Sequence, residues 1–165
     1  MTDAALSQIL LDALEDERKA EATYGAVIEK FGPVRPFVRI IEAERRHAAA
    51  VERQMERLGI PVPANNWTGR GVAPATLTLA CEEAIAAEIE NIALYDRLLP
   101  TVSDREVLKV LTNLQAASLE RHLPAFRRCL EREAGGEGRG GRGQAGGQHR
   151  GRGHTGRRQQ GHGCP

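Results

Sequence analysis

The chain has few of the residues that build disulfide-rich, aromatic-rich or membrane-spanning proteins. Its 165 residues include three cysteines, three phenylalanines, two tyrosines and one tryptophan. Three dispersed cysteines are too few for a disulfide scaffold. No apolar run approaches the roughly 20 residues that a membrane-spanning helix needs, and the N-terminus lacks the basic start of a signal peptide. We therefore expect a cytoplasmic protein with no membrane partner.

Alternation of apolar and polar residues, the pattern of a half-buried strand, is also missing. Instead, four segments repeat apolar residues at helical spacing, and glycine or proline interrupts the pattern at Gly32, Gly59 and Pro100. The expected helices cover residues 4–30, 36–59, 75–99 and 103–133. Ser103 to Glu106 is a capping box at the start of the last helix. The sequence predicts an all-α protein.

The last 31 residues, 135–165, differ in composition from the rest: 13 are glycine, six are arginine and three are histidine. Such a segment cannot bury enough apolar surface to offset the entropy lost on ordering. We therefore predict a folded domain at residues 1–134 and a disordered tail at 135–165. The tail has six Arg and one Glu (+5), and the domain has 17 basic and 21 acidic residues (−4). A flexible, solubilising tail is the favoured interpretation; weak nucleic-acid binding through Arg-Gly clusters and loose metal binding are the alternatives.

The connections between the predicted helices indicate the topology. The first and third connections are short, so each should form an antiparallel helical hairpin. The second, residues 61–74, has 14 residues, which at about 3.3 Å each can run the length of the bundle. Two hairpins joined by one long crossover is the arrangement found in ferritin-like bundles.

Ionisable residues lie near the middle of the apolar stripe of every predicted helix. A buried carboxylate costs several kcal/mol unless it is paired or bound to a metal ion. Glu44 and His47 form a Glu-x-x-His pair whose spacing points both side chains the same way. Imidazole together with carboxylate suits iron, zinc or manganese. We therefore predict a shared metal centre made by Glu17, Glu44, His47, Glu88 and His122.

Over residues 6–130 the chain resembles the rubrerythrin-like branch of the ferritin-like superfamily. The resemblance rests on Asp16–Tyr24, Pro36-Phe37, Glu44–His47, Pro61–Pro63, Ala87–Ile89, Tyr95-Asp96, Ala117-Ser118 and His122–Phe126. It implies a ferritin-like four-helix bundle that holds two iron ions per chain, with manganese or zinc as alternatives. It also implies a di-iron carboxylate oxidoreductase that acts on peroxide or dioxygen.

The chain departs from the superfamily pattern on the fourth helix, where Leu119 stands in place of the expected glutamate. Glu21, one turn beyond Glu17, is the predicted substitute, and Asn91 is a second candidate. Without a substitute, the second metal ion is weakly held or absent. No Cys-x-x-Cys pair of the rubredoxin type is present, so an oxidoreductase of this kind needs an external electron donor. A homodimer is expected by analogy alone.

Two other functions stay open at this stage. One is a non-catalytic module that binds or stores metal. The other is a structural bundle with a vestigial site, in which the core carboxylates pair with Arg46 or with the histidines. Whether the chain is an enzyme is therefore undecided. Tyr24 and Tyr95 are interpreted first as core residues and second as hydrogen-bonding neighbours of the metal ligands.

Two cysteines occupy matching positions on the third and fourth predicted helices. Cys81 lies seven residues before Glu88, and Cys129 lies seven residues after His122. On antiparallel helices these offsets run in the same direction by about 10 Å, so the two thiols should lie at one level and face each other. They are interpreted as small buried residues, with a redox pair as the alternative.

Overall fold

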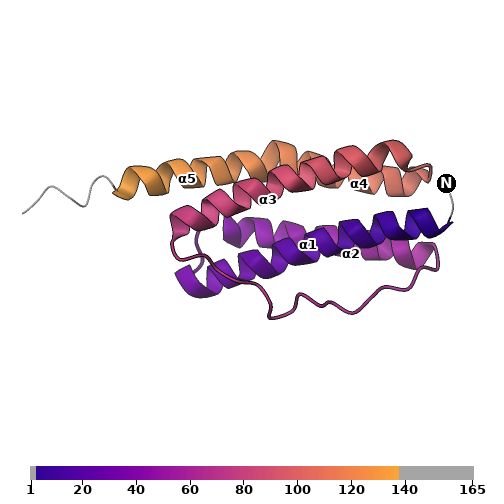
Figure 1. The fold of residues 1–165 in the computed structure, drawn as a ribbon, viewed down its shortest axis with the longest axis horizontal. Coiled ribbons are helices and arrows are strands. Elements are labelled where there is room, and N and C mark those ends of the chain that lie inside the picture. The colour runs from indigo at the N-terminus through magenta and orange to yellow at the C-terminus, as the bar shows by residue number, and fades with distance from the viewer. Residues whose placement is uncertain (1–2, 138–165) are drawn as a thin grey trace, which may run out of the picture.

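The computed structural model describes residues 3–137, which form a bundle of four long helices (Figure 1). The elements are α1 (Asp3–Phe31), α2 (Phe37–Arg57), α3 (Leu77–Leu98), the 3₁₀ turn η1 (Leu99–Thr101), α4 (Arg105–Ala117), the π-helical turn η2 (Ser118–His122) and α5 (Leu123–Glu137). Together α4, η2 and α5 make the fourth long helix (Figure 1). No strand occurs within residues 3–137. The prediction of an all-α four-helix bundle is confirmed.

The ends of the helices follow from local sequence. Gly32 and Gly59 adopt positive φ angles of 84° and 68° after α1 and α2, a conformation that is inexpensive only for glycine. Thr76 caps α3 by accepting a hydrogen bond from the backbone N–H of Leu79. At the start of α4 the prediction of Ser103 as the cap is wrong. Asp104 caps this helix, because its Oδ1 accepts backbone N–H groups at 2.9 and 3.0 Å.

The fourth helix contains a wide turn that its sequence pattern does not show. In η2 the backbone N–H of Leu123 bonds to the carbonyl of Ser118, five residues earlier. The cause is Pro124, which has no N–H to give to the carbonyl four residues before it and whose ring crowds that carbonyl. A wide turn relieves the conflict without ending the helix. The wide turn also changes the directions of the side chains before it, relative to those after it, from the directions they would have on a regular helix.

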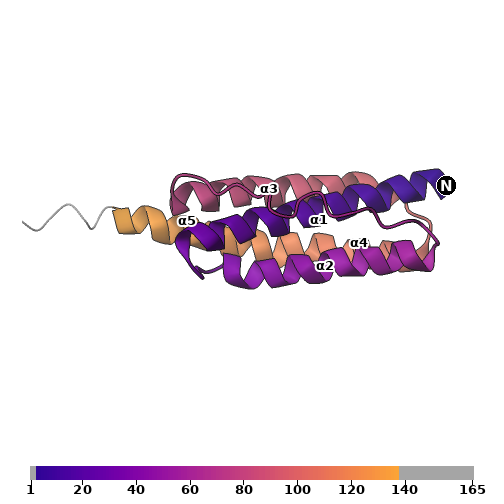
Figure 2. The same cartoon turned by 90° about the horizontal axis from the view of Figure 1, so that it is seen from below.

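The long connection between α2 and α3 runs along α1 for most of the length of the bundle (Figures 1 and 2). Arg18, a buried residue, donates to the carbonyl of Pro63 at 3.0 Å and pairs with Glu52 at 2.9 Å. Lys30 donates to the carbonyl of Pro74 at 2.6 Å. Gly71 lies so close to α1 that a Cβ there would stand 1.9 Å from a backbone oxygen. The predicted crossover is therefore present and is attached to α1 along its course.

The core has two apolar clusters with a polar layer between them. One cluster gathers residues such as Leu10, Val51 and Leu111, and the other gathers residues such as Phe37 and Phe126. Along every long helix, buried charged or polar residues separate the two clusters; they are Glu17, Glu44, Glu88, Asn91, Ser118 and His122. The stability of the bundle comes from the clusters, and the polar layer is the place where function is expected.

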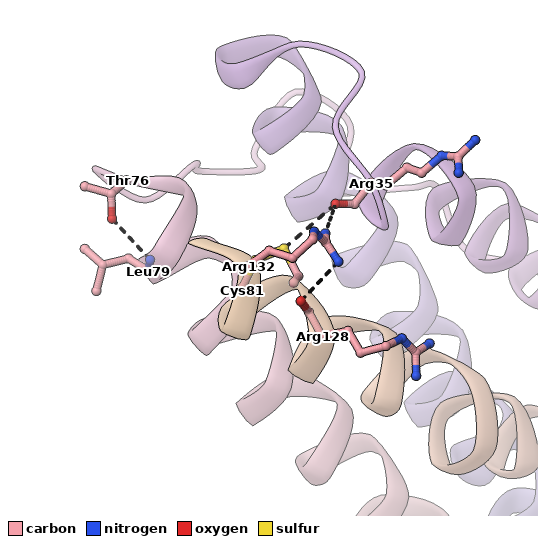
Figure 3. The surroundings of a disulfide bond; sticks show 7 residues. Arg35, Thr76, Leu79, Cys81, Arg128 and Arg132 are labelled. Atoms are coloured by element: carbon pink, nitrogen blue, oxygen red, sulfur yellow. Dashed lines mark hydrogen bonds between the residues drawn. A yellow bond between two sulfur atoms is a disulfide. The ribbon is translucent and has the colours of Figure 1, made fainter. Parts of the chain in front are cut away.

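A disulfide joins Cys81 of α3 to Cys129 of α5 in one of the apolar clusters. Figure 3 shows its surroundings, where Arg132 donates to the carbonyl oxygens of Arg35 and Arg128 at 3.0 Å each. The prediction that the two thiols face each other is confirmed. By the chain-entropy account, closing a loop of 48 residues stabilises the fold by about 4 kcal/mol.

The C-terminal boundary lies slightly beyond the predicted one. α5 continues to Glu137, three residues past 134. The predicted tail from residue 138 onward lies outside the described residues. Within residues 3–137, none of the helices combines the length and apolar character that crossing a membrane requires.

Candidate metal centre

Glu44 is the central residue of the polar layer. It is buried on α2, and its two carboxylate oxygens face two different histidines. Its Oε2 lies 3.0 Å from Nδ1 of His47, and its Oε1 lies 3.1 Å from Nδ1 of His122. The two imidazole rings are stacked with centroids 5.5 Å apart. A carboxylate that turns one oxygen to each of two imidazoles has the arrangement of a bridging ligand.

Two further glutamates complete a pair of matching groups. Glu17 of α1 lies with Oε2 3.1 Å from Nδ1 of His47, and Glu88 of α3 lies with Oε1 3.5 Å from Nδ1 of His122. Each group therefore has one histidine, one glutamate of its own and Glu44 in common, with all ligand atoms of a group within 4.8 Å of one another. All five residues predicted from the sequence come together.

The ring nitrogen of His122 fits a metal ion better than a hydrogen bond. Its Nδ1 is buried and has two carboxylate oxygens within 3.5 Å, but neither oxygen lies where an N–H group would point. The atom therefore has no hydrogen-bond partner, and most buried polar atoms do have one. A cation held jointly by the nitrogen and the carboxylates would satisfy it. The donor set of imidazole and carboxylate suits iron, manganese or zinc.

Tyr24 and Tyr95 each donate a hydrogen bond to one of the two glutamates that belong to a single group, Glu88 and Glu17. The hydroxyl of Tyr24 donates to Oε1 of Glu88 at 2.9 Å, and that of Tyr95 donates to Oε1 of Glu17 at 2.7 Å. Burial raises the pKa of both phenols well above 10, and the nearby carboxylates raise it further. Both hydroxyls therefore keep their protons as donors. The two tyrosines are core residues that also orient the candidate ligands.

Protons balance part of the negative charge of the buried carboxylates. Burial raises the pKa of Glu17, which the neighbouring Glu44 raises further. Burial would also raise the pKa of Glu44, but its close ion pairs with His122 and His47 outweigh the effect of burial and lower that pKa. For both histidines burial opposes the charged form, yet the carboxylates raise each pKa to about 9. The protons on the two imidazoles thus supply positive charge that bound cations would otherwise supply.

The residue beside His122 on the inner face is Ser118, not Leu119. Leu119 has 51% of its surface exposed, whereas Ser118 is 4% exposed. The prediction that Leu119 occupies the position of the missing glutamate is therefore wrong. The prediction assumed a regular helix, in which the residue three before His122 shares its face. Because the turn η2 is wider than an α-helical turn, the residue that shares the face of His122 is the one four positions before it, Ser118.

Neither predicted substitute for the missing glutamate joins the two groups. Glu21 accepts a hydrogen bond from Arg45 at 2.9 Å on the outer side of α1 and α2. The amide of Asn91 donates to Asp16, and its oxygen accepts from the hydroxyl of Ser118 at 2.8 Å. This Asp16–Asn91–Ser118 chain was not predicted, because nothing in its residue types separates it from ordinary partly buried polar residues.

A cavity of about 370 Å³ reaches this polar layer from the surface between α1 and α3. The crossover loop borders it with Trp67, whose Nε1 donates to Glu15 at 2.6 Å. Glu17, Glu44 and Glu88 line its inner end. Three of the five candidate ligands, all of them buried glutamates, therefore border this cavity.

A family model described as "Uncharacterized protein domain (DUF2202)" matches residues 7–139. The chain belongs to this family. The DUF2202 match covers all five candidate ligands and both tyrosines. The hypothetical protein MJ0754 from Methanococcus jannaschii has a similar structure, with a TM-score of 0.72 and 21% identity over 81% of this chain and 83% of that chain. No curated protein matches the chain. The DUF2202 domain thus shares its helical fold with an archaeal protein.

Proposed function

We propose that this DUF2202 domain binds two metal ions, iron foremost, and works as a rubrerythrin-like oxidoreductase of the ferritin-like superfamily that reduces peroxide or dioxygen. The observation that supports this most strongly is Glu44, whose two oxygens each face one histidine. Two histidines around one buried carboxylate would not help a bundle with a purely structural role. Burying these charged groups costs free energy, and apolar side chains at the same positions would avoid that cost.

Each of the two groups of ligands would bind one metal ion. Glu17 and His47 would hold one ion, Glu88 and His122 the other, and Glu44 would contact both. A bound ferrous pair would supply two electrons to the oxidant. Compared with the superfamily pattern, the centre lacks one carboxylate, and Ser118 stands in its place. This leaves an open side for the oxidant next to the Asp16–Asn91–Ser118 chain.

Two tyrosines and a cavity would help the site to react with an oxidant. The hydroxyls of Tyr24 and Tyr95 keep Glu88 and Glu17 in fixed orientations, as hydrogen-bonding neighbours of metal ligands generally do. The cavity would give a path to the centre, and the crossover loop borders it with Trp67, Arg70 and Val72. The electrons would be replaced by an external donor protein.

The experiment that tests this function is anaerobic loading of the full-length chain with ferrous iron, removal of unbound iron and mixing with hydrogen peroxide. The loaded protein is expected to consume peroxide at one equivalent per two ferrous ions, with ferric absorbance growing in step. Glu44→Gln should abolish the reaction. Glu120→Gln is the matched control, because Glu120 is an exposed carboxylate in the same turn as His122.

Two outcomes would count against the proposal. Peroxide consumption that is equal in the wild type and in Glu44→Gln would show that the reaction occurs elsewhere. Ferrous iron that binds in the wild type but reacts neither with peroxide nor, in a parallel sample, with dioxygen would leave a metal-binding module without redox activity.

A further inference from the structure

The cavity beside the metal centre is much larger than the proposed oxidant needs. Its volume is about 370 Å³, whereas a water-sized molecule occupies about 30 Å³ of liquid. The cavity therefore has room for roughly ten molecules of that size. Pockets that bind small organic ligands begin near 300 Å³. Access for peroxide or dioxygen does not explain a space of this size.

Small and apolar side chains create the space. α3 contributes Ala80 and Ala84 to one wall, and α1 contributes Ala20 and Val27 to the other. Lining residues on α3 extend from Ala80 to Asn91, and the eleven helical steps between them correspond to about 16 Å. The cavity is therefore long, with apolar walls over the part that lies farther from the metal centre.

The inner end of the cavity is polar. Asn91 and Ser118 line it beside Asp16 and Glu88. Buried carboxylates at this end disfavour an anionic group, and the buried hydrogen-bonding chain can exchange bonds with an uncharged hydroxyl or carbonyl group. Charged residues of both signs border the cavity away from its inner end, so they do not select for the net charge of a ligand. These residues are Lys19, Arg70, Glu83 and Glu90.

We propose that this cavity binds an elongated, uncharged organic molecule, with its apolar body against the alanines of α3 and its single polar head at Asn91 and Ser118. The inference rests on the proposed function for the place of the metal centre, and it deepens that function by naming the class of organic ligand that binds beside it. It needs the cavity but no bound metal, so binding can be measured on the metal-free chain.

The probe is a series of straight-chain primary alcohols from butanol to decanol, added to the full-length chain. Trp67 lines the cavity and is the only tryptophan of the sequence, so its fluorescence reports binding directly. Saturable changes are expected, with the dissociation constant falling about fourfold for each added methylene. The gain should stop once the alcohol fills the length of the cavity.

Two variants narrow the cavity from opposite walls: Ala84→Leu on α3 and Ala20→Leu on α1. Each should weaken binding of the longer alcohols at least tenfold if its helical content is unchanged. Ala93→Leu, on α3 but outside the cavity lining, is the matched control. Using both walls keeps the test valid if one variant fails to fold.

Absence of a saturable change in the wild type, or equal affinities in all four proteins, would overturn the inference. Ferrous titration of the same samples separates this failure from failure of the proposed function. Alcohol binding without metal binding leaves the cavity assignment standing and removes the oxidoreductase. Metal binding without alcohol binding does the reverse.

Discussion

Ser118 is the residue that would limit the number of carboxylates in the proposed metal centre. It lies on the inner face of the wide turn beside His122 and borders the cavity, so a longer side chain has room there. We predict that Ser118→Glu binds the second ferrous ion about tenfold or more tightly than the wild type, because it restores a carboxylate ligand. Leu119→Glu should leave the affinity unchanged, because residue 119 faces solvent. Anaerobic calorimetric titration measures both.

An outcome in which Leu119→Glu, and not Ser118→Glu, tightens binding would show that the fourth helix is regular in solution. The comparison therefore tests the wide turn at a single pair of neighbouring residues. Both variants add one carboxylate, so their net charges are matched.

At the scale of helices and loops, Gly71 is the point where the crossover loop meets α1 most closely. A Cβ at this position would stand 1.9 Å from the carbonyl oxygen of Ala22, a backbone atom that cannot move aside alone. Gly71→Ala is expected to lower the free energy of unfolding by about 1–3 kcal/mol, because the loop must lift from the helix. Urea denaturation measures the change.

Gly135→Ala is the matched control for this substitution. Gly135 lies in α5 with open space around its Cβ position. Alanine there should raise the free energy of unfolding by up to about 1 kcal/mol, because it favours helix. If both variants changed stability equally, the close approach of loop and helix would not be real.

The helices and the candidate ligands could be predicted from the sequence because both depend on residues that are close along the chain. Apolar periodicity located each helix, and a charged residue inside an apolar stripe, such as Glu17 or Glu88, is visible without coordinates. The fourth helix was the exception. The sequence contains Pro124, but the Glu-x-x-His pattern assumes a regular helix. In a regular helix the residue three positions before His122 shares its face, and that residue is Leu119.

Features that depend on contacts between distant segments could not be predicted. The bond of Arg18 to the carbonyl of Pro63 spans 45 residues, and Asn91 bonds to Asp16 across 75. The sequence indicates that these residues are polar, not which partner each one meets. Ser103 and Asp104 are both good capping residues, and only the backbone conformation separated them.

For the molecule as a whole, the protonated histidines would link the proposed metal binding to stability. Their pKa values are about 9 in the folded chain and about 6.5 in the unfolded chain. Because the folded state holds these protons more tightly, the stability they provide is complete below pH 6.5 and is lost as pH rises through 9. The raised pKa of Glu17 acts in the same direction.

We therefore predict that the free energy of unfolding of the metal-free protein falls between pH 6.5 and 9. The metal-loaded protein should not lose stability in this range, because cations then replace the protons. Urea denaturation at a series of pH values, with and without zinc, measures both curves. Parallel curves would mean that the histidines do not carry this charge, or that zinc binds elsewhere.

The most direct test of the metal centre is the number of ferrous ions that bind per chain under anaerobic conditions. The account predicts two ions in the full-length wild type, over and above any that remain in the double variant His47→Ala/His122→Ala. This difference removes the contribution of histidines in residues 138–165. Equal stoichiometry in the wild type and the double variant would contradict the account, because Glu44 and its two histidines would then hold no metal.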